Sequence, residues 1–384
     1  MADFQRLLSL PALLAKKSFF LFGPRATGKS FLVNSQLGDQ ALVLDLLRSD
    51  LSFRLSADPG LLEGLIGDRR GSRAWVVIDE VQKLPILLDE VHRLIESRGP
   101  RFLLTGSSAR KLKRGQANLL AGRAWTAHLH PLTWAELPRF DLPRFLRWGG
   151  LPPVVASDEP AEELRAYVGT YLQEEILAEG FVRRLPQFSR FLTTAALTSG
   201  QTLNFAQIAS DAGVPAATVR EYYFLLEDTL VGFLLPAWTK SKRRKAISTA
   251  RFYFFDTGVT HALAGTETLD RNSDLYGRSF EQWIGMELRA YLDYRRRDDG
   301  LAYWRSIHQH EVDFVVGDHT AIEVKATRKV TGRDLRGLQA IAEERRFQKL
   351  LLVSEDRVEA AYGPIRCLPW SRFVEELWAD RLLR

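Results

Sequence analysis

The sequence predicts an α/β protein of several domains, and three observations support that prediction. An apolar run at 18–22 is followed by a glycine-rich loop and a helix-like segment, which together make a strand–loop–helix unit. A second apolar run at 74–78 ends in two acidic residues. Near the carboxyl end, strand-like runs alternate with helix-like segments. The chain has 384 residues, enough for two or three domains.

The composition excludes several classes of protein. With 46% hydrophobic and 26% charged residues, the chain is globular rather than disordered. No apolar run approaches the roughly 20 residues that span a bilayer, and no signal-peptide pattern follows the acidic start at Asp3. The single cysteine, Cys367, excludes an internal disulfide and a cysteine-cluster zinc site. We therefore expect a cytoplasmic protein with no membrane partner.

Residues 23–30 are the loop of the first unit. They are Gly23, Pro24, Arg25, Ala26, Thr27, Gly28, Lys29 and Ser30. Gly-x-x-x-x-Gly-Lys-Ser between a strand and a helix is the pattern of a phosphate-binding loop, in which backbone N–H groups surround an anion. Lys29 is expected on the β- and γ-phosphates, and Ser30 in a magnesium shell. The sequence thus predicts ATP and Mg²⁺ as cofactors; the other interpretation is a chance glycine-rich turn.

The second apolar run ends in Asp79 and Glu80, which is the Walker B pattern. A parallel strand would place both carboxylates at its carboxyl end, beside the phosphate loop. Asp79 is then expected to hold Mg²⁺ through water, and Glu80 to orient or deprotonate the attacking water. The alternative is a pair of solvated acids at a strand end.

Five short motifs stand in order in the first third of the chain. They are residues 23–25 (Gly-Pro-Arg), 77–83 (Val-Ile-Asp-Glu-Val-Gln-Lys), 104–108 (Leu-Thr-Gly-Ser-Ser), 121–123 (Ala-Gly-Arg) and 131–136 (Pro-Leu-Thr-Trp-Ala-Glu). Through them the chain resembles the bacterial and archaeal AAA-type ATPases whose C-terminal half is a domain of unknown function. The resemblance covers essentially the whole chain. It implies the fold and ATP binding more firmly than a biological role.

The resemblance implies two further roles in ATP hydrolysis. The strand at 101–108 is similar to the sensor strand between the two Walker strands, and either Thr105 or Ser107 would present its hydroxyl to the γ-phosphate. Arg123 stands between a helix-like segment and the strand at 124–129, where such ATPases carry an arginine finger. The alternative for Arg123 is a cation at a helix carboxyl end. A finger acting in trans would require a homo-oligomer.

The remainder divides into three expected domains after an ATPase core at 1–140. A helical lid or linker is expected at 141–200, because a stretch rich in proline and glycine precedes helical apolar spacing at 161–181. A winged helix-turn-helix is expected at 201–265, and a restriction-endonuclease-like α/β domain of the PD-(D/E)xK kind at 266–384.

The winged helix is predicted from a helix after Asn204, a turn at Gly213 and a second helix at 216–227. Strands at 230–236 and 251–255 follow, with a basic tip between them. The cations expected to contact nucleic acid are Lys240, Lys242, Arg243, Arg244 and Lys245 at the tip, and Arg220 on the outward helix face. Such cations suit the DNA phosphate backbone. The alternatives are a solvated tip or a wing that docks protein.

The nuclease-like domain is predicted from the order of its elements. A helix at 276–294 precedes strands at 301–305, 311–316 and 321–325, a helix at 332–344 and a strand at 349–353. An aspartate and then Glu-x-Lys on adjacent strands belong to the restriction-endonuclease-like fold, and the family resemblance implies the same. The residue before the aspartate is Val312 and not proline, a departure that the fold tolerates.

The expected chemistry of this domain is metal-dependent. Asp313 and Glu323 are expected to share a Mg²⁺ ion, with Glu281 completing the shell, and Lys325 to position or activate the attacking water. The alternative is a structural ion pair, because many such folds have lost cleavage.

Two functions follow. The first is a DNA-binding ATPase that couples Mg-ATP to action on structured or branched DNA, with a possible metal-dependent nuclease site. The second is an ATP-dependent switch or adaptor whose winged helix and C-terminal domain dock a protein partner without cutting nucleic acid.

Overall fold

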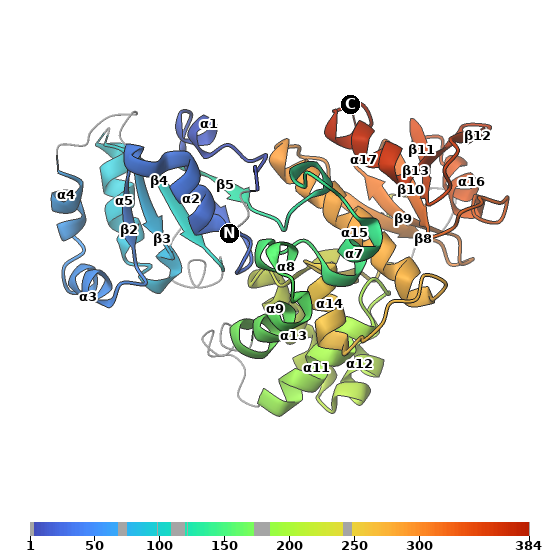
Figure 1. The fold of residues 1–384 in the computed structure, drawn as a ribbon, viewed down its shortest axis with the longest axis horizontal. Coiled ribbons are helices and arrows are strands. Elements are labelled where there is room, and N and C mark those ends of the chain that lie inside the picture. Colours follow the sequence, from blue (N-terminus) through green and yellow to red (C-terminus); the bar gives the residue numbers. More distant parts are fainter. Residues whose placement is uncertain are drawn as a thin grey trace.

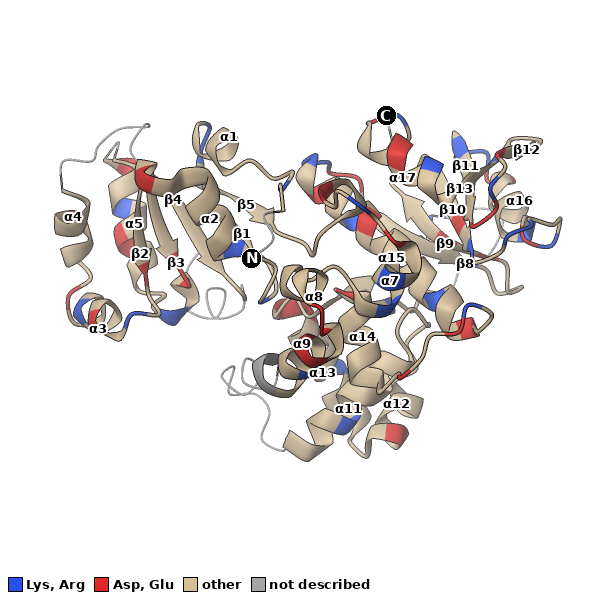
Figure 2. Cartoon of the chain, viewed as in Figure 1, with Lys and Arg blue, Asp and Glu red and all other residues tan. Residues whose placement is uncertain are grey.

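The computed structural model describes residues 4–67, 75–97, 99–108, 120, 122–172, 185–240 and 248–383. Figure 1 shows an N-terminal lobe (blue to cyan) beside a C-terminal lobe (orange to red), with a mostly helical region (green to yellow) below them. Acidic and basic residues are spread over all three regions (Figure 2).

The N-terminal lobe contains a five-stranded parallel sheet in the order β2-β3-β4-β1-β5. The strands are β1 (Ser18–Phe22), β2 (Ala41–Asp45), β3 (Trp75–Asp79), β4 (Arg101–Gly106) and β5 (Ala124–His128). The expected sensor strand, β4, does lie between the two Walker strands, β1 and β3. This parallel sheet confirms the α/β prediction for the first third.

Alternate side chains of this sheet face two helical layers, as the pleat requires. Phe20 and Ile78 pack with α3 (Ser49–Ala57), α4 (Leu61–Ile66) and α5 (Leu87–Glu96). Phe19 and Val77 pack on the other face with α1 (Leu10–Leu14) and α2 (Lys29–Leu37). Both faces are covered, so the central strands β1, β3 and β4 appear as apolar runs in the sequence.

A chain of short helices leads out of this lobe. These are η3 (Trp134–Glu136), α7 (Leu142–Trp148), α8 (Pro152–Ala156), α9 (Pro160–Ala166), the π-helical η4 (Tyr167–Leu172) and α11 (Leu185–Leu197). The long helix expected at 161–181 is described only as far as Leu172. The helices α8, α9 and α11 share one apolar core with α12 (Phe205–Ala212) and α13 (Ala216–Asp228).

The helices α12 and α13 begin and end where the sequence indicates. The Asn204 side chain accepts a hydrogen bond from the Gln207 backbone N–H at 3.2 Å and caps α12. Gly213 follows α12 at φ 67°, a left-handed conformation that suits glycine. Pro215 then precedes α13.

A two-stranded antiparallel sheet joins the helical region to the C-terminal lobe. It consists of β6 (Gly232–Leu235) and β7 (Arg251–Phe254), both slightly shorter than expected. Along β7, Phe252 and Phe254 belong to the helical core, whereas Tyr253 packs in the core of the C-terminal lobe. One short strand therefore contributes to two cores.

The C-terminal lobe contains a six-stranded sheet in the order β12-β13-β11-β10-β9-β8. The strands are β8 (Leu301–Arg305), β9 (Glu311–Val316), β10 (Thr320–Lys325), β11 (Lys349–Ser354), β12 (Ala360–Tyr362) and β13 (Ile365–Pro369). The first three form the expected antiparallel meander, and β11 joins β10 in parallel. The strands β12 and β13 extend the sheet beyond what the sequence analysis anticipated.

Helices cover both faces of this second sheet. After α14 (Thr257–Ala264) come α15 (Asp274–Tyr294) and, at the end of the chain, α17 (Trp370–Trp378), which share one core with the sheet. The shorter α16 (Arg336–Ala342) packs on the other face. None of the helices in the described ranges combines the length and the apolar character needed to cross a membrane.

The buried carboxyl of Glu287 on α15 should make stability depend on pH. It accepts hydrogen bonds from Trp134 N at 2.8 Å, Trp283 Nε1 at 3.1 Å and Trp378 Nε1 at 2.7 Å. Burial nevertheless raises its pKa from 4.5 to about 7. The contribution of this group is therefore complete below pH 4.5 and lost as pH rises through about 7, a change of order 3 kcal/mol. Urea unfolding between pH 5 and pH 8 should show a smaller fall for Glu287→Gln than for the wild type; equal falls would contradict this.

Candidate active site

The loop between β1 and α2 has the backbone of a phosphate-binding loop. Gly28 has φ 93° immediately before α2, and Ala26 also has a positive φ of 62°. A Cβ at Gly23 would lie 2.5 Å from the Leu129 carbonyl oxygen, so only glycine fits there. The sequence pattern is thus matched by two backbone positions that require glycine.

Lys29, at the first position of α2, is buried and lies along this loop. Its Nζ donates hydrogen bonds to the carbonyl oxygens of Gly23 at 2.7 Å and Pro24 at 3.1 Å. The Thr27 hydroxyl also donates to the Pro24 carbonyl, at 2.8 Å. The ammonium is therefore held at the loop that the sequence assigns to the phosphates.

Ser30, Asp79 and Thr105 bring three elements together beside the loop. The Ser30 hydroxyl donates to Asp79 Oδ2 at 2.8 Å, and the Thr105 hydroxyl donates to Asp79 Oδ1. A hydroxyl beside a carboxylate supplies the hard oxygen ligands that Mg²⁺ prefers. Ser30 and Asp79 thus fit the predicted magnesium site of a nucleotide.

Glu80 follows Asp79 in a left-handed conformation, with φ 60°. Its backbone N–H donates to the Thr105 hydroxyl at 3.2 Å, and its carboxylate accepts a hydrogen bond from Gln82. Burial raises the pKa of Glu80, although the nearby Lys29 ammonium opposes the shift. A carboxylate with a raised pKa is a better acceptor for the proton of an attacking water.

Gln82 was given no role in the sequence analysis, although it stands inside one of the quoted motifs. Its amide donates to Glu80 and, at 3.2 Å, to the Ser107 hydroxyl. The residue is 8% exposed, in the short helix η2 (Val81–Lys83) directly after the Walker B acids. The sequence signal for this residue was a glutamine three positions after the Walker B aspartate. Gln82 links Glu80 to Ser107, at the end of β4, and so positions the Glu80 carboxylate.

The two sensor candidates differ in their contacts, which leads to a test. Thr105 contacts Asp79 and the backbone of Glu80, whereas Ser107 reaches Glu80 only through Gln82. Thr105→Val should therefore lower the rate of ATP hydrolysis by about 10-fold or more, which is less than the roughly 100-fold or larger contribution of a group that itself transfers the proton, and Ser107→Ala should lower it less. Phosphate release at saturating ATP measures both; a larger loss for Ser107→Ala would reverse the assignment.

Arg6 is a second residue that the sequence analysis missed, and it joins the two lobes. Its buried guanidinium donates to the Thr27 carbonyl at 2.9 Å in the phosphate loop and to the Tyr294 hydroxyl at 3.0 Å on α15. It also pairs with the buried Glu136 at 3.0 Å and donates to the His130 carbonyl at 2.6 Å. These partners lie up to 288 positions away, so no local pattern could reveal them.

A cavity of about 700 Å³ opens beside the phosphate loop. Its walls come from the amino-terminal segment, the loop, α2, α8 and α9. They are Phe4, Arg6, Ala26, Gly28, Phe31, Pro152, Pro153, Ala156 and Glu163. The lining is mostly apolar, as in pockets that take a flat organic group.

Arg123 lies just before β5 and contacts α5. Its Nε donates to Glu96 Oε1 at 2.9 Å, and its side chain is 39% exposed. A role as arginine finger within one chain would require Arg123 to leave Glu96.

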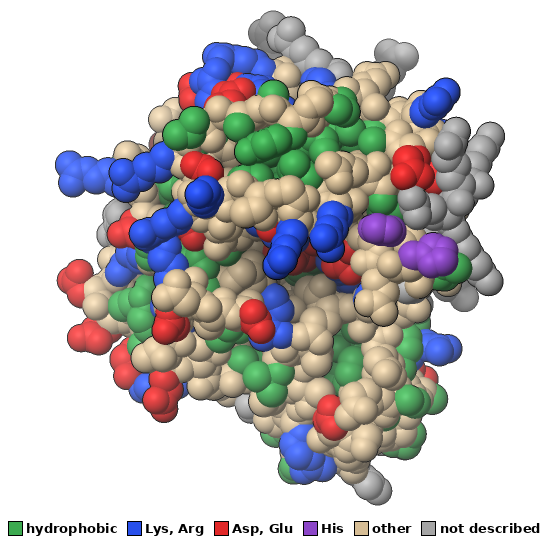
Figure 3. All heavy atoms as spheres, turned by 90° about the vertical axis from the view of Figure 1, so that its right-hand side faces the viewer, with side chains coloured by type: hydrophobic (Ala, Val, Ile, Leu, Met, Phe, Trp, Pro, Cys, Tyr) green, Lys and Arg blue, Asp and Glu red, His purple; other side chains and the backbone are tan. Residues whose placement is uncertain are grey.

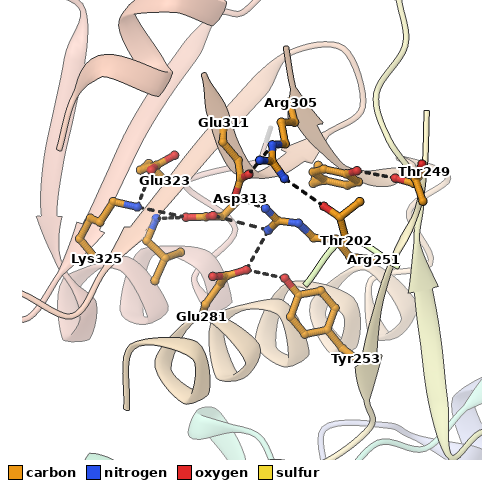
Figure 4. Close-up of polar contacts among 12 residues, drawn as sticks. Thr202, Thr249, Arg251, Tyr253, Glu281, Arg305, Glu311, Asp313, Glu323 and Lys325 are labelled. Atoms are coloured by element: carbon orange, nitrogen blue, oxygen red, sulfur yellow. Dashed lines mark hydrogen bonds and ion pairs between the residues drawn. The ribbon is translucent and has the colours of Figure 1, made fainter. Parts of the chain in front are cut away.

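The four predicted residues of the C-terminal site lie together (Figure 4). Lys325 Nζ is 2.6 Å from Glu323 Oε1 and 3.9 Å from Asp313 Oδ2. Asp313 Oδ2 also accepts a hydrogen bond from Val324 N at 2.9 Å. Burial, followed by the charge of Asp313, raises the pKa of Glu281 to about 7 and that of Glu323 well above 4.5.

Arg251 and Glu311 belong to this cluster as well, and neither was predicted. Arg251 Nη1 lies 3.0 Å from Glu281 and 3.6 Å from Asp313 Oδ1, and its Nη2 pairs with Glu311. Within the described ranges, no three acidic, histidine or cysteine side chains are placed to hold a metal ion. The Mg²⁺ shell expected from Glu281, Asp313 and Glu323 therefore does not fit this arrangement, because a guanidinium already engages two of its members.

The expected nucleic-acid residues fall into two groups. Lys240 pairs with Asp318 at 3.0 Å, and the exposed Arg220 lies 5.1 Å from the ring of Phe205. Arg220 also lines a cavity of about 770 Å³ between α13 and residues 248–250. The other group, Lys242, Arg243, Arg244 and Lys245, lies outside the described residues.

Among curated proteins, the chain is 23% identical over 295 residues to an uncharacterized protein of Haemophilus influenzae, covering 69% of this chain and 72% of that protein. It is 21% identical over 338 residues to an uncharacterized protein of Methanocaldococcus jannaschii, covering 79% and 73%. Neither relative has an assigned function that bears on this chain.

Solved structures show a weaker likeness. A Walker-type ATPase of Pyrococcus abyssi aligns with TM-score 0.46 and 14% identity, over 66% of this chain and 93% of that one. The Aeropyrum pernix ORC1 protein in complex with DNA aligns with TM-score 0.28 and 13% identity, over 67% and 90%.

Three families match consecutive parts of the chain. Residues 139–270 and 276–373 match two domains of unknown function, DUF8612 and DUF4143. Residues 15–138 match the family described as AAA domain, and they contain the five-stranded parallel sheet, the phosphate loop and the paired acids of β3. The first third of this chain is therefore an AAA-type P-loop ATPase domain.

Proposed function

We propose that this chain is a DNA-binding ATPase, in which ATP hydrolysis in the N-terminal lobe controls the helical region and the C-terminal lobe. The observation that carries the proposal is Arg6, because it bonds both to the phosphate loop and to α15. If the loop changes its conformation when phosphate binds or leaves, Arg6 would transmit that change to α15 in the C-terminal lobe.

In the proposed hydrolysis, each polar group beside the loop has one task. Lys29 neutralises charge on the β- and γ-phosphates. Ser30 and Asp79 would hold Mg²⁺, which supplies further charge neutralisation when bound. Glu80 accepts the proton of the attacking water. Thr105 holds Asp79 and Glu80 in register through its two hydrogen bonds.

The adenosine group is assigned to the cavity beside the loop. Its volume of about 700 Å³ is ample for a base and a ribose, and its Phe4, Phe31 and Pro152 walls are apolar. Arg6 also lines this cavity, so nucleoside binding would involve the same residue that reaches α15.

Arg123 has a place in this proposal only in a homo-oligomer. Its pair with Glu96 is more than one-third exposed on both sides, so it costs little to exchange. Arg123 of one copy would then contact the γ-phosphate of ATP bound to the neighbouring copy, where a cation stabilises the phosphoryl group being transferred.

The DNA contact is assigned to the helical region. The order α12, α13, β6, β7 supports the proposal of a winged helix, with Arg220 on the second helix and, in the sequence, a basic run at 240–245 between the strands. In Figure 3, basic and acidic side chains are interspersed on the exposed face of the C-terminal lobe. A local basic cluster is therefore the better candidate for contact with phosphates.

The test is the rate of ATP hydrolysis with and without branched DNA at low and high salt. We expect DNA to stimulate hydrolysis and binding to weaken steeply with salt. Arg220→Ala should reduce the salt slope by about one and leave hydrolysis without DNA unchanged. The exposed Lys83, on the ATPase lobe, provides the matched control in Lys83→Ala. Absence of both stimulation and salt-sensitive binding would refute the proposal.

The second candidate function is an ATP-dependent switch that docks a protein partner. It is favoured by the contacts of Arg251, which occupy the carboxylates that a nuclease would need for metal. Under this alternative, Lys29→Ala abolishes partner binding, and Glu323→Ala with Lys325→Ala changes nothing. The stimulation of ATP hydrolysis by DNA separates the two functions, because a switch that docks a protein partner is not stimulated by DNA. A plasmid-nicking assay in Mg²⁺ or Mn²⁺, with that double variant as control, reports on the C-terminal site alone.

A further inference from the structure

Arg251 is the most enclosed cation of the C-terminal site. Its side chain is 4% exposed, and its guanidinium lies 4.5 Å from the ring of Tyr303. Glu281, Glu311 and Asp313 approach it from α15 and β9 (Figure 4). The guanidinium nitrogens of Arg251 therefore face three carboxylates, and the guanidinium also lies against the ring of Tyr303.

Arg251 contacts several carboxylates at once, as a bound metal ion would. Burying several carboxylates together is unfavourable unless a cation or protons compensate the charge. Arg251 supplies that cation, and Lys325 supplies a second one next to Glu323. Glu323 Oε2, in turn, is buried and has no hydrogen-bond partner among the described residues. One buried oxygen of Glu323 is therefore left without a hydrogen bond, while Lys325 contacts the other oxygen of the same carboxylate.

The origin of Arg251 links this pocket to the strand pair of the helical region. Arg251 is the first residue of β7 and directly follows residues 248–250, which line the cavity beside Arg220. The Tyr303 hydroxyl donates to the Thr249 carbonyl, and Leu203 N donates to the Ala250 carbonyl at 3.0 Å. The guanidinium is therefore positioned by the strand that carries the expected wing.

We propose that Arg251 is the resident cation of the Glu281–Asp313–Glu323 pocket and that its guanidinium excludes divalent metal from it. A metal ion and Arg251 compete for the same oxygens of Glu281 and Asp313. Because β7 is buried in two hydrophobic cores, it holds the guanidinium in the pocket and keeps the pocket closed to metal. This inference does not depend on the ATPase activity or on DNA binding.

Titration of the nucleotide-free full-length protein with Mn²⁺, followed by electron paramagnetic resonance, tests the proposal. Arg251→Gln removes the charge and leaves a shorter, polar and uncharged side chain with fewer hydrogen-bond donors. We expect it to bind one Mn²⁺ ion at least about 10-fold more tightly than the wild type does, since a like charge at contact distance is removed. Adding Asp313→Asn to this variant should abolish the gain.

Two controls identify the cause. Arg251→Lys retains a cation and should bind Mn²⁺ no better than the wild type. Arg305→Gln removes a neighbouring arginine that contacts Glu311 at 3.4 Å, and it should also match the wild type. A gain in Arg305→Gln equal to that in Arg251→Gln would overturn the proposal, because any nearby charge would then suffice.

The wild type provides a test that does not require a folded Arg251 variant. Wild type and Asp313→Asn should bind the same number of Mn²⁺ ions, because Arg251 closes the pocket in both. A wild-type Mn²⁺ ion that disappears in Asp313→Asn would overturn the proposal, as would a folded Arg251→Gln protein with no gained ion. If Arg251→Gln is destabilised, a rise in its melting temperature with Mn²⁺ larger than that of the wild type supports the proposal.

Discussion

Replacing Lys29 with alanine should lower the rate of ATP hydrolysis by at least about 100-fold, the loss typical of removing one positioned group that stabilises transition-state charge. Lys29 is buried and held on the Gly23 and Pro24 carbonyls, so its charge is delivered without reorganisation. The change also removes attraction for the β- and γ-phosphates, so ATP affinity should fall. Phosphate release at several ATP concentrations measures both effects.

Lys83→Ala is the matched control for this prediction. Lys83 is an exposed lysine in η2, one residue after Gln82, and it should leave hydrolysis unchanged. Glu80→Gln gives a complementary result, because it should retain ATP binding and lose hydrolysis. If Lys29→Ala hydrolysed ATP at the wild-type rate, the assignment of the loop would be wrong.

Replacing Arg6 with alanine should lower the free energy of unfolding by about 3–5 kcal/mol, the range for breaking a buried ion pair. The side chains of Arg6 and Glu136 are 4% and 0% exposed, so the change leaves an uncompensated buried carboxylate. It also removes the hydrogen bonds from Arg6 to the Thr27 carbonyl in the phosphate loop and to the Tyr294 hydroxyl on α15. Urea unfolding at pH 7 measures the loss.

A double-mutant cycle distinguishes the ion pair from packing. Adding Glu136→Gln to Arg6→Ala should recover part of the lost stability, because the stranded charge is then absent. Arg48→Ala removes an exposed pair with Asp50 and should cost less than about 1 kcal/mol. Equal losses for Arg6→Ala and Arg48→Ala would show that the Arg6 contacts do not bear on stability.

The parts of the fold that the sequence predicted share a physical cause. The central strands β1, β3 and β4 of the N-terminal sheet are buried along nearly their whole length and therefore appear as continuous apolar runs, which is why they were identified. In the meander β8–β10, which was found with nearly correct ends, the same reason applies to β9 and β10. The exposed three-residue β12 carries no such signal, and it was missed.

The site residues that were missed depend on contacts distant in sequence. Gln82 contacts Ser107, which is 25 positions away, and Arg251 contacts Glu311, which is 60 positions away. An arginine in an ordinary strand or near the chain start has no neighbours that indicate its role. The sequence therefore predicted the acidic residues of the C-terminal pocket but not Arg251, the arginine that compensates their charge.

The sequence by itself determined the phosphate-binding loop and its Walker B partners, because a glycine pattern and an acid-ended apolar run are local consequences of backbone and strand geometry. Only the tertiary structure decided where Arg6 and Arg251 act. Their positions follow from how β5, β7 and α15 pack against one another, and a buried guanidinium is stable only where that packing supplies carboxylates and carbonyls from distant segments.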